Sequence, residues 1–120
     1  MIANKRPLSV TILAWVYIAM GTVGFVYHFR EFLARNASGY DAVLIEVVRL
    51  LAILCGVFML RGQNWARWLA VAWIAFHVIV SAFHSVNEFA VHLLFCAMIA
   101  WIVFRPDAGR YFGGARTEAA

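Results

Sequence analysis

Two charged residues stand inside an apolar run that is long enough to form a helix. The run covers residues 41–60 and carries Glu46 and Arg49 in its first half. Charged side chains are costly within a membrane, so they mark a structural pair or a functional site. The two residues are three positions apart, which places them on one helical face within reach of each other. We expect an intramembrane ion pair that locks helix packing, and the alternative is a site for a substrate or a proton.

The four histidines form a second group with possible chemistry. They are residues 28, 77, 84 and 92, and all four fall toward the same end of the predicted helices. Neutral imidazoles bind metals and haem, and they exchange protons near neutral pH. A carboxylate can orient the second nitrogen of a ligating imidazole, a role that Glu46 or Glu88 could fill. The candidate cofactor ligands are therefore His77 and His92, and the candidate metal ligands are His77, His92 and Glu46.

Other arrangements of the histidines remain open. Their spacing includes no H-x-x-x-H or H-E-x-x-H motif. Histidines near a membrane interface also form hydrogen bonds with the backbone around them. The depth of each residue along its predicted helix places His77 and His92 in one layer with Glu46 and Arg49. A lid above that layer is formed by His28, His84 and Glu88.

The composition indicates that membrane helices position these groups. Of the 120 residues, 65% are hydrophobic and 13% are charged, whereas soluble domains are roughly one quarter charged. A spanning helix needs about 20 apolar residues, so four runs with short connectors use nearly the whole chain. We predict an all-α fold, a single membrane domain in which four transmembrane helices form an up-down-up-down bundle.

The helix boundaries follow from local signals. Gly21 and Gly24 offer a face on which a second helix can come close. Ser85 and Glu88 are spaced as a capping box, in which each satisfies a free backbone N–H at a helix start. Pro106 stops the last apolar run. We expect spans at about 8–29, 42–60, 65–84 and 87–104, followed by a polar tail, 105–120, that is loose at its end.

The basic residues predict one orientation. Seven of them fall on one side of the expected topology and two, Arg30 and Arg35, on the other. Positive residues favour the cytoplasmic side, so both termini are expected in the cytoplasm of a cell whose inner, or plasma, membrane holds the chain. The seven are Lys5, Arg6, Arg61, Arg67, Arg105, Arg110 and Arg116.

The sequence argues against several classes of function. Its cysteines, Cys55 and Cys96, lie inside apolar runs without a CxxC motif, which predicts packing roles. The basic residues form no stripe with interleaved aromatics, so no nucleic-acid partner is expected. The expected partners are the lipid bilayer and either a second copy of the chain or a larger membrane complex. A hydrolytic nucleophile with its base, or a phosphate-binding loop, is not recognisable, so we expect a non-enzymatic protein.

Three segments carry a resemblance to known membrane proteins. They are the opening 6–11, the connector 61–68 and the close 104–106. With these segments the chain resembles small four-helix bacterial inner-membrane proteins that carry no established activity, which implies location and topology only. By size it is also similar to the small multidrug resistance transporters. Those proteins carry their essential acid in the first helix, where this chain has none, so no site residue carries over.

These observations lead to three ranked expectations for function. The first is a non-enzymatic accessory or small-molecule-binding membrane protein. The second is a haem- or metal-binding redox component with an outward-facing histidine cluster. The third is a proton-coupled exporter of small molecules.

Overall fold

The described part of the chain is entirely helical. The computed structural model describes residues 5–35 and 40–119, and within them it has five helices and no strand. Four of these helices are long and apolar enough to cross a membrane, over Leu8–Glu31, Ala42–Leu60, Asn64–Ala82 and Val86–Phe104. The predicted all-α class is confirmed, and so is the prediction of four helices that are long and apolar enough to span a membrane. The helices are α1 (Leu8–Arg35), α2 (Tyr40–Leu60), α3 (Asn64–Ala82), α4 (Val86–Phe104) and α5 (Pro106–Ala119).

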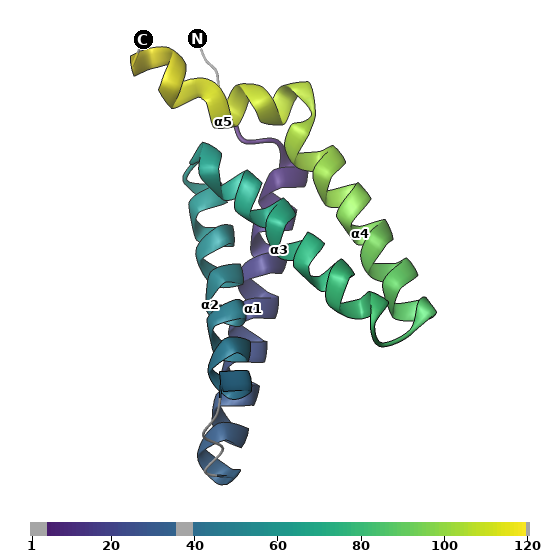
Figure 1. Ribbon diagram of the computed structural model, residues 1–120. Coiled ribbons are helices and arrows are strands. Elements are labelled where there is room, and N and C mark those ends of the chain that lie inside the picture. The colour runs from purple at the N-terminus through teal and green to yellow at the C-terminus, as the bar shows by residue number, and fades with distance from the viewer. Residues whose placement is uncertain (1–4, 36–39, 120) are drawn as a thin grey trace.

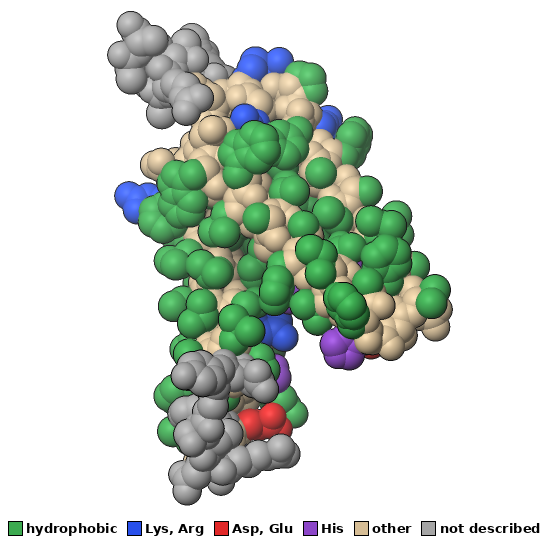
Figure 2. Space-filling view, viewed as in Figure 1, with side chains coloured by type: hydrophobic (Ala, Val, Ile, Leu, Met, Phe, Trp, Pro, Cys, Tyr) green, Lys and Arg blue, Asp and Glu red, His purple; other side chains and the backbone are tan. Residues whose placement is uncertain are grey.

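The four long helices form two hairpins that diverge. α1 and α2 lie side by side, α3 and α4 form the second hairpin, and α5 lies across the end at which the two hairpins meet (Figure 1). We call this end the α5 end and the opposite one the open end. α1 and α4 scarcely touch, so the helices do not close into the symmetrical bundle that a simple up-down-up-down order suggests. Apolar side chains cover both hairpins, and basic ones gather at the α5 end (Figure 2).

Glycines allow α1 and α2 to pack closely. A Cβ atom added at Gly56 would lie 2.5 Å from the carbonyl oxygen of Ala14 and 2.6 Å from Cγ1 of Ile18. One added at Gly21 would lie 2.7 Å from Cγ1 of Ile53. Lipid offers little hydrophobic drive for helix association, so van der Waals contact between close backbones is a principal source of stability. The small face predicted on the first helix therefore does meet a neighbour, and that neighbour is α2.

Buried polar side chains tie α3 to both helices of the first hairpin. The Tyr17 hydroxyl on α1 donates to the carbonyl oxygen of Ala70 at 2.7 Å. The indole N–H of Trp73 donates to the carbonyl oxygen of Val48 on α2 at 2.8 Å. Polar groups inside a membrane protein need internal partners because lipid supplies none. These two bonds hold α3 at a fixed level against α1 and α2.

The turn between α3 and α4 forms half of the predicted capping box. The Ser85 hydroxyl accepts a hydrogen bond from the backbone N–H of Glu88 at 3.1 Å. The reciprocal bond is replaced, because the backbone N–H of Ser85 donates to the carbonyl oxygen of Ser81 at 3.1 Å. Ser85 therefore caps α4 while the end of α3 takes its N–H.

The tail forms a helix, which differs from the expectation of a loose polar segment. Ala108 and Phe112 on α5 are buried, and the hydroxyl of Tyr111 contacts the last carbonyl oxygens of α2, those of Met59 and Leu60, at 2.8 Å each. Positions 108, 111 and 112 share one helical face, an i, i+3, i+4 pattern that builds an apolar stripe. This short stripe was overlooked because glycines and charged residues surround it.

Candidate functional site

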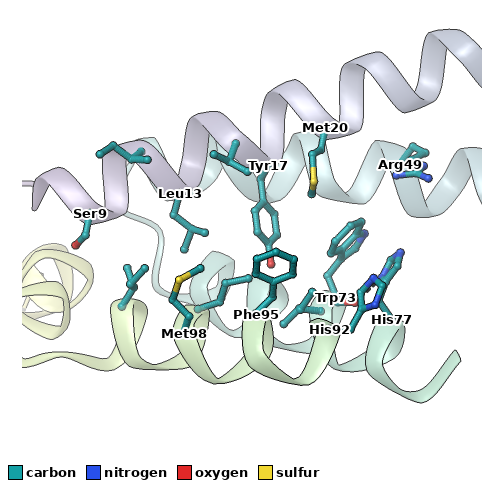
Figure 3. Close-up of a pocket in the computed structure, with 15 residues that line it drawn as sticks. Ser9, Leu13, Tyr17, Met20, Arg49, Trp73, His77, His92, Phe95 and Met98 are labelled. Atoms are coloured by element: carbon teal, nitrogen blue, oxygen red, sulfur yellow. Dashed lines mark hydrogen bonds between the residues drawn. The ribbon is translucent and has the colours of Figure 1, made fainter. Parts of the chain in front are cut away.

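The main cavity lies between the two hairpins, where α1 and α4 diverge. Its volume is about 530 Å³, within the range of roughly 300 to 1,000 Å³ that is typical of ligand pockets. Figure 3 shows side chains from all four long helices pointing into it. We call it the interhairpin cavity. Its lining is Ser9, Ile12, Leu13, Val16, Tyr17, Met20, Arg49, Trp73, Ile74, His77, His92, Phe95, Met98, Ile99 and Ile102.

Most of the interhairpin cavity is an apolar trough. On α1 its lining runs from Ser9 to Met20, about 17 Å of helix at 1.5 Å per residue. Val16 on α1 and Met98 on α4 are 45% and 46% exposed, so the trough is open between these two helices. Methionine side chains adapt to irregular shapes, and one stands on each side of the opening.

The polar end of the cavity combines a guanidinium group with two imidazoles. His77 on α3 and His92 on α4 lie with ring centroids 6.1 Å apart and planes inclined by 20°. The Trp73 ring also packs against His77, with centroids 3.9 Å apart and planes inclined by 33°. Arg49 projects from α2 on the opposite side of the gap (Figure 3). The cavity is thus elongated and apolar, with its polar groups gathered toward the open end.

Hydrogen bonds orient both imidazoles. Nδ1 of His77 lies 2.9 Å from the carbonyl oxygen of Trp73. Nδ1 of His92 lies 2.8 Å from the carbonyl oxygen of Glu88 and 2.9 Å from the hydroxyl of Ser81. A carbonyl oxygen only accepts, so Nδ1 of His77 carries a proton, and a neutral ring then has a lone pair on Nε2. His77 can therefore receive a proton or a hydrogen bond at Nε2.

The expected ion pair of Glu46 and Arg49 is not formed in the part of the chain that the structure describes. Both carboxylate oxygens of Glu46 are buried without a hydrogen-bond partner there. The Arg49 side chain instead crosses α1 at Gly24, where an added Cβ would lie 2.8 Å from its Cδ and Nε atoms. Glu46 borders a separate cavity that Phe25 and Phe29 also line. The glycine gives the arginine a path to the interhairpin cavity, and this path separates the two charges.

The structure brings together some of the predicted site residues and separates others. His77, His92 and Arg49 share the cavity, whereas Glu46 lies outside its lining. Over the described ranges 5–35 and 40–119, no three metal-ligating side chains converge. The candidate metal set of His77, His92 and Glu46 is therefore not assembled.

The residues expected to form a lid do not line the cavity either. Nδ1 of His84, just beyond the end of α3, lies 2.9 Å from the carbonyl oxygen of Val80 in the last turn of that helix. The His28 ring packs edge-on against Tyr27 on α1. Glu88 uses its backbone N–H at the start of α4 and its carbonyl oxygen to hold His92. Of these three, only Glu88 acts on the site, and it does so through its backbone.

Sequence reasoning missed the apolar wall that α1 contributes. Tyr17 and Met20 on α1 and Phe95 and Met98 on α4 face the cavity. Both helices are apolar on nearly every side, so hydrophobic periodicity does not distinguish the cavity-facing residues from those that face lipid. Only the divergence of the hairpins identifies this wall.

Comparison with protein-family models, curated proteins and solved structures finds no match to this chain.

Proposed function

We propose that the chain is a small-molecule-binding membrane protein that takes an elongated apolar molecule from the bilayer into the interhairpin cavity. The observation that carries this proposal is the form of the cavity: about 530 Å³, apolar for most of its length, polar at one end and bordered by half-exposed side chains between α1 and α4. A ligand dissolved in lipid would enter sideways through that opening without crossing the polar ends of the protein. The role is binding or carriage, not catalysis.

The location and orientation form part of the proposal. The chain lies in the inner membrane with both termini in the cytoplasm, as seven basic residues against two favour. The α5 end then faces the cytoplasm, and the polar end of the cavity lies nearer the outer surface. Arg49 lies seven residues after Ala42, where the α2 span begins, which is about 10 Å along the helix. The cavity therefore has the orientation of an amphiphile in the outer leaflet, whose polar head points outward and whose chain points toward the bilayer centre.

Cavity-blocking variants test the proposal. In nanodiscs, a neutral long-chain alcohol bearing a photoreactive diazirine should label the cavity-facing residues of α1 and α4, as mapped by mass spectrometry. Val16→Trp should fill the trough and reduce this labelling at least ten-fold. Val23→Trp is the matched control, because Val23 is on the same helix, is 70% exposed and lies outside the cavity lining. Labelling spread evenly over all lipid-facing residues and unaffected by Val16→Trp would contradict the proposal.

A proton-coupled exporter is the second candidate, and Glu46 is the observation that favours it. Its carboxylate oxygens are buried within a membrane helix and lack a hydrogen-bond partner among the described residues. Acidic residues inside transporters commonly relay protons. Ligand binding to the purified protein should then release or take up a proton in weakly buffered solution, and Glu46→Gln should abolish that exchange. If the Glu46→Gln variant exchanges as many protons on ligand binding as the unaltered protein does, binding is not coupled to a proton on this residue.

A further inference from the structure

The polar end of the interhairpin cavity contains a cation without an acidic partner. The Arg49 guanidinium makes no hydrogen bond or salt bridge within the described ranges. The nearest acid in sequence on its own helix, Glu46, borders a different cavity. Arg49 and His77 line the same polar end of the interhairpin cavity. Since a charge at this depth is costly, an anion that entered the cavity beside it would be stabilised.

We infer that the cavity binds a long-chain carboxylic acid, with its carboxylate on Arg49 and its hydrocarbon chain along the trough between α1 and α4. This inference rests on the proposed binding function and assigns its ligand class. A guanidinium presents a planar fork of N–H donors that matches the two oxygens of a carboxylate. The trough next to it supplies the apolar contact that the chain requires.

The size of the cavity selects a single chain. If a methylene group occupies about the 30 Å³ that a water molecule takes up in the liquid, a volume of 530 Å³ holds roughly 15 to 18 such groups. That is one hydrocarbon chain of ordinary membrane length, and two chains exceed it. A fatty acid therefore fills the cavity with its one chain, whereas the second chain of a diacyl phospholipid would lie outside it, in the opening between α1 and α4.

The imidazoles give the acid's proton a destination. A carboxylic acid in the bilayer is neutral and enters with its O–H intact. In the cavity the O–H bond breaks, the proton binds the lone pair on Nε2 of His77, and the carboxylate remains beside Arg49, where its negative charge offsets the repulsion between the guanidinium and the new imidazolium. The ring is positioned for this because its Nδ1 is already bound to the Trp73 carbonyl oxygen. The products are an imidazolium and a carboxylate, so charge and protons balance. The other groups that face His77 are Arg49 on α2, His92 on α4 and Tyr17, through Trp73, on α1.

Competition experiments test the ligand class. The protein is placed in phosphatidylcholine nanodiscs and labelled with the neutral alcohol probe, and hexadecanoic acid, hexadecanol and hexadecyl phosphate compete for the site. The acid should displace the probe at a concentration at least ten-fold lower than the alcohol does. Equal potency of acid and alcohol would overturn this inference while leaving the binding function intact. Failure of all three to displace the probe would overturn the binding function itself. Greater potency of hexadecyl phosphate than of the acid would overturn the carboxylate assignment.

Variants at the anchor complete the test. Arg49→Met should abolish the advantage of the acid over the alcohol, so that the two displace the probe at similar concentrations, and probe labelling retained on α1 and α4 shows that the protein is folded. If that variant does not fold, Gly24→Ala provides the test. The Cβ atom added at position 24 would push the Arg49 side chain aside without removing its charge. It should weaken acid binding several-fold and leave alcohol binding intact. An acid advantage that survives in the folded variant would show that Arg49 does not hold the ligand.

Discussion

The two ends of the molecule use their arginines differently. At the α5 end, Arg67 donates to the carbonyl oxygen of Val103 at 3.3 Å, and its guanidinium lies 5.0 Å and 5.5 Å from the ring centres of Phe104 and Phe112. Toward the open end, Arg49 makes no such bond to any residue that the structure describes. The first arginine joins α3, α4 and α5 into one unit. The second has donors left for a ligand.

This difference identifies which charges serve the fold. Arg6 follows the pattern of Arg67, since it donates to Thr11 at 2.8 Å and to the carbonyl oxygen of Leu60 at 2.8 Å. Both groups satisfy backbone or side-chain acceptors where helices end. Arg49 lies within α2, away from the helix ends at which carbonyl groups lack intrahelical partners. A polar group that the fold positions but does not pair is the strongest indication of a binding site in this chain.

The largest expected effect concerns the close packing within the first hairpin. Gly56→Ala should lower the free energy of unfolding in detergent by about 3 kcal/mol, because the new Cβ would lie 2.5 Å from a backbone oxygen and the helices must separate. Gly113→Ala is the control, since its Cβ meets nothing within 4 Å. It should gain up to about 1 kcal/mol from helix propensity. Equal effects of the two changes would show that α1 and α2 are not packed this closely.

A pair of matched arginine substitutions sharpens the comparison of the two ends. Arg67→Met should lower the free energy of unfolding by about 1 to 2 kcal/mol, because it removes a charged hydrogen bond and two contacts with aromatic rings. Arg49→Met should leave stability unchanged or raise it, because it removes an unpaired charge from the membrane. Tryptophan fluorescence during denaturation measures both. A larger loss at Arg49 than at Arg67 would give Arg49 a structural role.

The sequence predicted the helices well because long apolar runs leave few alternatives. The ends of α2 and α4 follow from Gly62, whose φ is +76°, and from Pro106. α5 was missed because its buried face comprises only three apolar positions on a glycine-containing segment. Local patterns thus give the membrane spans and leave the short surface helix undetected.

The candidate site was predicted in part. His77, His92 and Arg49 were grouped by their depth along the helices, and depth follows directly from sequence position. The direction in which each side chain faces does not follow from sequence position, because the crossing angles depend on packing between helices. The path of Arg49 over Gly24 and the divergence of α1 from α4 are tertiary features, and they remove Glu46 from the site.

The smallest expected effect is the coupling between Glu46 and Arg49. Spacing alone favours a salt-bridged pair, in which the double variant would lose less stability than the sum of the single losses. In the structure the Glu46 oxygens have no hydrogen-bond partner among the described residues, and Arg49 turns toward a different cavity. The stability changes of Glu46→Gln and Arg49→Met should therefore add to within about 0.5 kcal/mol, as they do for sites that share no contact. A double-mutant cycle from denaturation in detergent measures this coupling. A coupling above about 1 kcal/mol would restore the ion pair, leave Arg49 without a free charge for a carboxylate and make the two ends of the molecule alike.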